Sequence, residues 1–428
     1  MSSKRKYEWR IGSPPPRLEE HSLAKHELLR SYVQRYIQIL AADPRHDRLN
    51  VTLVDGFAGG GMYHREGTPF PGSPLILLDE VACARADFAA TRIKPFALNA
   101  DFLFVEALRP SVEHLDYTIR QSPYAVELDS TIHLLHADFG AALPRVIEHI
   151  RGRGRAHRAL FFLDQYGYGN VAFRDVRAIL SQLENPEIIL TFSVDWIIDY
   201  LTNEETFLKA MLPLELGHDR VREMLALRDN GGREARWLIQ NFLYQHLQER
   251  TGAPFYTCFF IRSPRSHRTY WLVHISKHPR ARDEMAVRHW SLSNHFVHHG
   301  RPGTQMLGYD PGQSFDQIPL DFLFDDNAEA RSQAALMEEL PHRIFKPEQV
   351  ARGGTTLGML FTEICNATPA TIDLVSKALV GLRSESEVQI LTKDGRDRPR
   401  SAHCGWDDII LPARQRSLFS PISPARKA

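Results

Sequence analysis

The chain has 428 residues, enough for two or three domains, and its 43% hydrophobic and 24% charged residues are typical of a folded protein. Lys plus Arg and Asp plus Glu both total 52, which excludes a globally basic nucleic-acid-binding protein and leaves that role to a local patch. The sequence has no apolar run long enough to span a membrane and no signal-peptide pattern, and its four scattered cysteines lack metal-ligand spacing. We therefore expect a cytoplasmic protein with reduced thiols.

The N-terminal part predicts a lead-in, a helix and a strand. The first residues, up to about position 20, include three consecutive prolines and predict a loose or polyproline-like segment. Apolar residues then recur at helical spacing from about Leu18 to Leu40. The apolar run 51–54 ends at Asp55 before a glycine-rich turn, which predicts a buried parallel strand feeding a tight loop.

The glycine-rich turn departs from the nicotinamide-binding fingerprint. His64 stands where a third glycine would open the helix, and the acid Asp55 precedes the glycines. That arrangement is typical of S-adenosylmethionine (SAM) methyltransferases. In this interpretation Gly59 and Gly61 pass the methionine moiety closely, Asp55 orients the loop or the amino group, and Phe57 belongs to the same cofactor-binding turn. A glycine-rich turn after an ordinary core strand is the alternative.

Four further apolar runs repeat the strand pattern, and three of them end directly in an acid. These acids are Glu106, Asp138 and Asp164, while the fifth run, 188–192, ends near Asp195. Helical stretches separate the runs, which predicts βαβ units and a parallel sheet. Because open α/β sheets bind ligands at the carboxyl ends of their strands, the aligned acids indicate a site there.

The rest of the first domain predicts a helical insertion and a hairpin. Residues from about 203 to 250 are amphipathic and charged, as expected of a lid or a substrate-binding insertion. The runs 255–261 and 270–275 predict two antiparallel strands with a short connection. Five parallel strands closed by an edge hairpin form the sheet of a class I methyltransferase, so we predict a Rossmann-like domain over 18–295.

The C-terminal part predicts a different module. Residues 296–342, rich in Gly, Pro and Asp, are expected to form a linker or an ordered loop, and 343–415 follow the helix–helix–strand–strand order of a winged helix. Five basic residues are candidates for nucleic-acid binding: Lys377, Lys393, Arg396, Arg398 and Arg400. The last four fall in or beside the predicted wing and could contact phosphates, and protein contacts are the equal alternative.

Taken in order, the motifs resemble the three-Cys-motif partner proteins. That family shows a Lys-containing N-terminal helix, a strand reading Asp-x-Phe-Ala-Gly-x-Gly followed by Tyr, then Gly-Ser-Pro, and later a strand ending Asp-Pro-Tyr-Gly. The corresponding residues here, within 18–290, are Lys25, Asp55–Gly61, Tyr63, Gly72–Pro74, Asp164–Gly167 and the late segment Tyr270–Pro279 with Met285. Gln165 departs from the family, which usually has a proline that would fix φ at this position.

The resemblance implies a methyltransferase-like domain that uses SAM. It also implies a partner with a three-cysteine motif, similar to radical-SAM proteins that repair nucleic acid. No reaction follows from the resemblance itself.

Roles for the strand-end acids follow from the methyltransferase interpretation. Glu106 would accept the ribose hydroxyls and Asp138 would meet the adenine amino group, although Asp138 could instead be a helix N-cap. Asp164 and Tyr166 occupy the place of the catalytic motif of base-amine methyltransferases. Asp164 would accept a hydrogen bond from the nucleophile and Tyr166 would stack on a planar substrate. The alternative has Asp164 capping the next helix and Tyr166 packing in the core.

We therefore predict a SAM-dependent methyltransferase-like protein that acts on nucleic acid or a nucleobase-like substrate. One rival is an accessory module with a degenerate cofactor site that presents nucleic acid to the partner. Another is a Mg²⁺-dependent hydrolase or transferase using Asp55, Asp138 and Asp164. We predict no metal site in one late group of histidines, which has no acid or cysteine at ligand spacing: His289, His295, His298 and His299.

Overall fold

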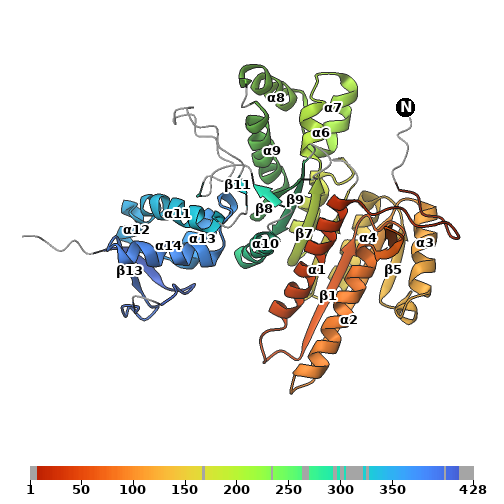
Figure 1. Cartoon of the computed structure of the whole chain (residues 1–428), viewed down its shortest axis with the longest axis horizontal. Coiled ribbons are helices and arrows are strands. Elements are labelled where there is room, and N and C mark those ends of the chain that lie inside the picture. The colour runs from red at the N-terminus through yellow and green to blue at the C-terminus, as the bar shows by residue number, and fades with distance from the viewer. Residues whose placement is uncertain are drawn as a thin grey trace, which may run out of the picture. The chain divides into compact units, whose positions relative to one another are not determined.

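The computed structural model of the chain forms two compact units (Figure 1). Unit 1 comprises Met1–Arg301 and Leu307–Asp325, and unit 2 comprises Pro302–Met306 and Asp326–Ala428. The structure describes residues 7–165, 169–232, 235–262, 269–292, 296–298, 303–304, 322–323, 327–399 and 402–413.

Unit 1 is built around a sheet whose strands follow the order β11-β10-β8-β9-β7-β6-β1-β4-β5. Five neighbouring strands are parallel: β1 (Arg48–Asp55), β4 (Ala97–Glu106), β5 (Ile132–His136), β6 (Arg158–Leu163) and β7 (Asn185–Phe192). The antiparallel strands are β8 (Phe255–Arg262), β9 (Thr269–Ser276), β10 (Phe296–His298) and β11 (Phe322–Leu323). With β9 inserted between β7 and β8, the order is that of the class I methyltransferase sheet. The predicted fold class is confirmed, and two short strands extend the sheet beyond the predicted hairpin.

The strand order reverses between β1 and β6. From β1 the chain adds β4 and β5 on one side, and it then returns to add β6 and β7 on the other. Asp55 at the end of β1 pairs in register with Phe104 of β4 and Phe162 of β6. The carboxyl ends of β1, β4 and β6 therefore meet at one edge, at the topological switch point where open α/β sheets bind ligands.

Helices cover both faces of this sheet (Figure 1). Strand residues such as Val54 and Phe161 share one core with α4 (Phe139–Gly152), α5 (Phe173–Gln182) and α9 (Ala235–Thr251). Successive strand side chains point to opposite faces, so Leu53 and Phe162 face the other side. The helices on that side are α1 (Glu20–Leu40), α2 (Ser73–Thr91) and α10 (Pro279–Ser291).

The remaining elements of unit 1 connect these layers. After β1 come the hairpin β2 (Met62–Arg65) and β3 (Thr68–Pro71), then α3 (Arg109–Arg120) and η1 (Ala125–Glu127) later in the chain. The segment predicted as a helical insertion, about 203 to 250, contains α7 (Glu205–Met211), η2 (Leu212–Leu214), α8 (His218–Asn230) and α9, and α6 (Val194–Asp199) precedes it. Its apolar side chains, among them Met211 and Met224, join the core beneath α4 and α5. The insertion is therefore an integral part of unit 1.

The N-terminal segment is more ordered than the sequence predicts. Trp9 is only 6% exposed, and its indole Nε1 donates to the Met62 carbonyl oxygen at 2.6 Å. The Leu18 amide donates to the His64 carbonyl at 2.9 Å, and the His64 amide donates to the Pro16 carbonyl at 3.0 Å. The prediction of a loose lead-in is wrong from Tyr7 onward, because these bonds hold the segment against the β2–β3 hairpin.

Unit 2 contains the predicted winged-helix elements. Its helices are α11 (Ala328–Ile344), α12 (Pro347–Ala351), α13 (Leu357–Ile364), η4 (Cys365–Ala367) and α14 (Ile372–Ser384). Its antiparallel strands are β12 (Thr355–Thr356), β13 (Val388–Leu391) and β14 (Ile409–Pro412), in the order β12-β14-β13. Thr356 and Thr371 cap α13 and α14 by accepting backbone N–H groups, which explains where both helices begin.

Helix α11 occupies the end of the segment that the sequence assigns to a linker. Leu336, Leu340 and Ile344 recur every four residues and are buried. The helix packs closely on α14, since a Cβ on Gly381 would lie 2.8 Å from the sulfur of Met337. The Gly, Pro and Asp content earlier in the segment obscured this helical spacing.

The described helices include none that is long and apolar enough to cross a membrane. Among the described residues, no cysteine forms a disulfide. Cys83 is exposed and the other three are buried: Cys258, Cys365 and Cys404.

Candidate functional site

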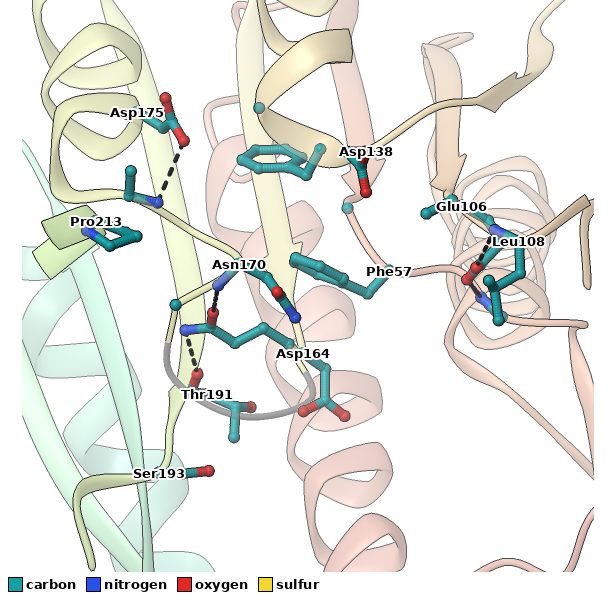
Figure 2. A pocket seen from close by; sticks show the side chains of 18 of the residues that line it. Phe57, Glu106, Leu108, Asp138, Asp164, Asn170, Asp175, Thr191, Ser193 and Pro213 are labelled. Atoms are coloured by element: carbon teal, nitrogen blue, oxygen red, sulfur yellow. Dashed lines mark hydrogen bonds between the residues drawn. The ribbon is translucent and has the colours of Figure 1, made fainter. Parts of the chain in front are cut away.

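A cavity of about 1500 Å³ opens at the carboxyl ends of the parallel strands (Figure 2). Its lining brings together residues that are far apart in the sequence. The strand-end loops contribute Gly56, Phe57, Gly59, Glu106, Asp138, Asp164 and Gln165; α1 contributes Lys25 and His26; the N-terminal segment contributes Tyr7 and Trp9; and the insertion contributes Lys209, Leu212 and Pro213. Most of the predicted cofactor residues therefore share one cavity, but Asp55 and Gly61 are outside its lining.

The glycines after β1 are required by packing inside the protein. Gly59 and Gly61 have φ of +61° and +81°, where side chains are strained. A Cβ on Gly59 would lie 2.9 Å from the Trp9 ring, and one on Gly60 only 2.2 Å. A Cβ on Gly61 would lie 2.7 Å from Leu115 of α3. The sequence interpretation gave these glycines to a ligand, whereas their Cβ positions face side chains of the same chain.

Asp55 holds the start of the glycine-rich loop in place. It is fully buried, and its Oδ1 accepts the Phe57 amide at 3.0 Å. Burial raises the pKa of Asp55 to about 7, with hydrogen bonds from Ser73 and the Phe57 amide acting in the opposite direction. Of its two predicted roles, orienting the loop fits this position. Phe57 itself reaches the cavity, with its ring 6.0 Å from that of Phe139.

Glu106 joins the end of β4 to the glycine loop. Its Oε2 accepts the Gly59 amide at 2.9 Å, and its Oε1 accepts the Leu108 amide at 2.8 Å (Figure 2). A carboxylate offers about four acceptor positions, so two backbone bonds leave capacity for ligand hydroxyls. Glu106 is half-buried and lines the cavity, as a ribose-binding acid must.

Asp138 sits at the N-cap position of α4, where the alternative interpretation places it. Its side chain makes no capping hydrogen bond, and it is exposed in the cavity wall. The backbone position of an N-cap is therefore combined with a side chain that is available to a ligand.

Asp164 is held by a lysine from the first helix. Lys25 Nζ donates to both carboxylate oxygens at 2.6 Å, and Lys25 is only 8% exposed. Burial alone would raise the pKa of Asp164, but the charge and hydrogen bonds of Lys25 hold that pKa below its usual value. The capping alternative is wrong, because α5 begins at Phe173 with Ala172 as its N-cap. Tyr166 lies outside the described residues.

Gln165 replaces the family proline with hydrogen bonds. Its Oε1 accepts the amides of Asn170 and Val171 at 3.0 Å, and its Nε2 donates to the Thr191 carbonyl at 3.1 Å (Figure 2). The side chain is buried. It fixes the two ends of the loop after β6, so the departure from the family does not leave that loop without support.

Sequence reasoning missed three residues of the site. Lys25 is part of the recognised motif but received no role, and its partner Asp164 is 139 residues away. His26 follows it on α1 and carried no signal of its own. Trp9 lies in a proline-rich stretch without helical or strand periodicity, so its large side chain was the one sequence signal that could have marked it as a buried residue.

The strand-end acids do not form a metal site. Within the described ranges, no three or more His, Cys, Asp or Glu side chains are grouped so that they could hold a metal ion. The donor set required by the Mg²⁺-dependent alternative, Asp55, Asp138 and Asp164, is therefore not assembled. Among the late histidines, His289 is buried and stacks on Phe259, while the side chains of the other three lie outside the described residues.

The basic residues of unit 2 are largely paired with acids. Lys377 Nζ is 2.6 Å from Glu329 and 3.0 Å from Asp373, and Arg398 donates to Asp408 at 2.9 Å. The wing residues Lys393 and Arg396 are exposed. Arg400 lies outside the described residues. The described stretches 327–399 and 402–413 contain nine Lys and Arg against twelve Asp and Glu. Over the whole of residues 326–428, Lys plus Arg total 14 and Asp plus Glu total 13, so the sequence of this module is close to neutral and not strongly basic.

Comparisons with known proteins agree with the division into two modules. A family model described as a GMT-like wHTH domain matches residues 308–395. The comparison with curated proteins gives no match.

Three solved structures give weak likenesses. Protein LPL1258 from Legionella pneumophila is 10% identical, with 60% of this chain and 84% of that chain covered and a TM-score of 0.34. M. jannaschii TYW2 in complex with AdoMet is 11% identical, with 60% of this chain and 76% of that chain covered and a TM-score of 0.28. Trm1 from Pyrococcus horikoshii with S-adenosyl-L-methionine is 12% identical, with 79% of this chain and 77% of that chain covered and a TM-score of 0.30. These likenesses are too low to carry an argument, so the fold assignment rests on the strand order.

Proposed function

We propose that unit 1 binds SAM and transfers its methyl group to nucleic acid or a nucleobase-like substrate. The observation that carries this proposal is the cavity at the switch point of a class I methyltransferase sheet, where the glycine loop, Glu106 and Asp138 converge. Ligand pockets are commonly about 300 to 1,000 Å³. A cavity of about 1500 Å³ has room for a cofactor and an acceptor together.

The residues present fit this cofactor. Glu106 keeps acceptor capacity for two hydroxyls, Asp138 can accept from an amino group, and Phe57 offers an apolar face beside them. When bound, SAM supplies a methyl group on a sulfonium, which is already activated for transfer. The chain must then hold donor and acceptor in line and exclude water, and the hydrogen bonds of Gln165 with the Asn170 amide and the Thr191 carbonyl help to hold the described part of the cavity wall.

We further propose that the chain is a three-Cys-motif partner protein and that it works with a radical-SAM-like protein carrying the three-cysteine motif. Residues of four separate motifs support this, because Lys25, Tyr63, Ser73 and Asp164 all line the same cavity. Co-expression with such a protein, followed by size-exclusion chromatography, tests the partnership. Separate elution of the two proteins at micromolar concentration would count against it.

Calorimetric titration of SAM and S-adenosylhomocysteine, first without metal and then with Mg²⁺, tests the cofactor. We expect binding without metal, and at least a roughly tenfold weaker affinity for Glu106→Ala, which is about 1.4 kcal/mol. Glu113→Ala is the matched control, because Glu113 is exposed on α3 and pairs with Arg109 on the surface. An unchanged affinity in Glu106→Ala would refute the ribose assignment.

The accessory-module alternative has one observation in its favour. Both oxygens of Asp164 are already bound by Lys25, as they would be if the acid had only a structural role. Filter binding separates the two functions, since an accessory module would retain nucleic acid but not SAM.

A further inference from the structure

His26 occupies an unusual place in the cavity wall. It follows Lys25 on α1, is only 4% exposed, and lines the cavity. Its ring stacks on Phe70 with a centroid distance of 6.5 Å and lies 5.8 Å from the ring of Tyr63. Aromatic contacts fix its position.

Its Nδ1 has no hydrogen-bond partner within the part of the chain that the structure describes. Leaving a buried polar atom unpaired costs about 1–3 kcal/mol, so such an atom calls for an explanation. Other buried histidines, such as His246 and His289, are not in the cavity wall. Because His26 lines the cavity, a bound ligand could supply the missing partner of its Nδ1.

Two acids of the cavity, Asp164 and Glu106, are poorly suited to take up a proton. Asp164 is ion-paired through both oxygens, and Glu106 already accepts two backbone amides. Burial lowers the pKa of His26 to about 4; nearby Asp164 acts to raise this pKa, while Lys25 and Arg30 act to lower it. The imidazole is therefore neutral near pH 7, and because its low pKa makes it a weak base, a proton that it receives must pass on to water at once.

We propose that His26 is the residue that receives the proton of the methyl acceptor, with the Lys25–Asp164 pair as its fixed neighbour. This inference rests on the proposed function. The lone pair of the acceptor nitrogen or oxygen forms a bond to the methyl carbon, and the carbon–sulfur bond breaks with its electrons left on sulfur. The acceptor proton passes to an imidazole nitrogen and then to water. The sulfonium becomes a neutral thioether, so charge and atoms balance.

Methyl transfer by the full chain tests the assignment. The protein is incubated with tritiated SAM and mixed-sequence single-stranded RNA or DNA, and label retained on the nucleic acid is counted. His26→Gln should bind SAM with an affinity within about twofold of the wild type. Its rate of methyl transfer should fall at least roughly 100-fold, because a general base typically contributes about 100- to 10,000-fold to a rate. His246→Gln is the control, because His246 is equally buried but lies away from the cavity.

Each outcome decides a separate point. Thermal unfolding checks the fold, and His26→Asn replaces His26→Gln if the larger amide disturbs packing. Transfer within about threefold of the wild type in a folded, SAM-binding variant would overturn the role of His26. A wild-type chain that binds no SAM refutes the proposed function, and the inference falls with it. SAM binding without transfer to either nucleic acid overturns the inference but leaves the cofactor assignment standing.

Discussion

The cavity of unit 1 and helix α14 of unit 2 use charged residues in different ways. In the cavity, Lys25 and Asp164 are largely removed from water and bind each other through two short hydrogen bonds. On α14, Lys377 is partly exposed and its charge is shared between two surface acids. Removing ions from water costs several kcal/mol each, whereas an exposed pair contributes about 0–1 kcal/mol. A buried charge therefore needs fixed partners, while a surface charge needs none.

The pH dependence of stability should show the largest effect, and it arises from Asp55. Its pKa is raised from 3.8 to about 7 in the folded protein. The folded chain holds the proton more tightly, so the contribution is fully present below pH 3.8 and is lost as pH rises through about 7. The loss over this range is about 4 kcal/mol. Asp55→Asn should remove this part of the slope.

Urea unfolding at several pH values, followed by tryptophan fluorescence, measures this slope. Five of the six tryptophans lie in unit 1, so the signal reports mainly on the unit that contains Asp55. Asp116→Asn, at an exposed residue paired with Arg120, is the control and should keep the wild-type slope. If Asp55→Asn keeps it as well, burial does not protonate Asp55.

Breaking the pair in the cavity should have the next largest effect. Lys25→Met leaves Asp164 buried without its cation, which we expect to destabilise unit 1 by about 3 kcal/mol. The double variant Lys25→Met/Asp164→Asn should recover most of that loss. Lys209→Met is the matched control, because Lys209 is exposed and pairs with Glu205 on the surface, so its expected cost is under about 0.5 kcal/mol.

The same urea unfolding measurement decides this prediction. Equal losses for Lys25→Met and Lys209→Met would mean that the cavity pair behaves like a surface pair. The comparison between the two regions would then have no energetic basis.

The sequence predicted elements with local signals and missed contacts between distant segments. Short apolar runs ending in acids predicted β1, β4, β5 and β6, because period and composition within a few residues define a buried strand. Asp55, Glu106 and Asp164 were expected to meet, since parallel strands align their ends. The Lys25–Asp164 pair was missed because a sequence pattern carries no information on a contact over 139 residues.

Packing also reversed one interpretation that composition favoured. The proline-rich start suggested a loose segment, but Trp9 occupies the space left by the absent Cβ atoms of Gly59 and Gly60. The need for glycine at these two positions therefore becomes apparent only from the packing of Trp9 in the fold. Lys377 stays a candidate for nucleic-acid binding, and its two acid partners became visible only in the fold.

The smallest effect is expected at Lys377. Because its ammonium is already neutralised by Glu329 and Asp373, Lys377→Ala should change the free energy of unfolding by no more than about 0.5 kcal/mol. It should also leave the affinity of the chain for duplex DNA unchanged in fluorescence anisotropy at low salt. Lys393→Glu/Arg396→Glu is the informative comparison, since both wing residues are exposed.

The two variants together locate any phosphate contact in unit 2. Binding weakens as salt rises, with a characteristic slope of log affinity against log salt concentration. Removing one residue that contacts a phosphate reduces the size of this slope by about one. If only the wing variant lowers that slope, the wing binds nucleic acid and α14 does not. If Lys377→Ala lowers it, the surface pairs on α14 open on binding, and the contrast with the fixed cavity pair becomes sharper. If neither variant changes the slope, a protein partner is favoured for the winged helix.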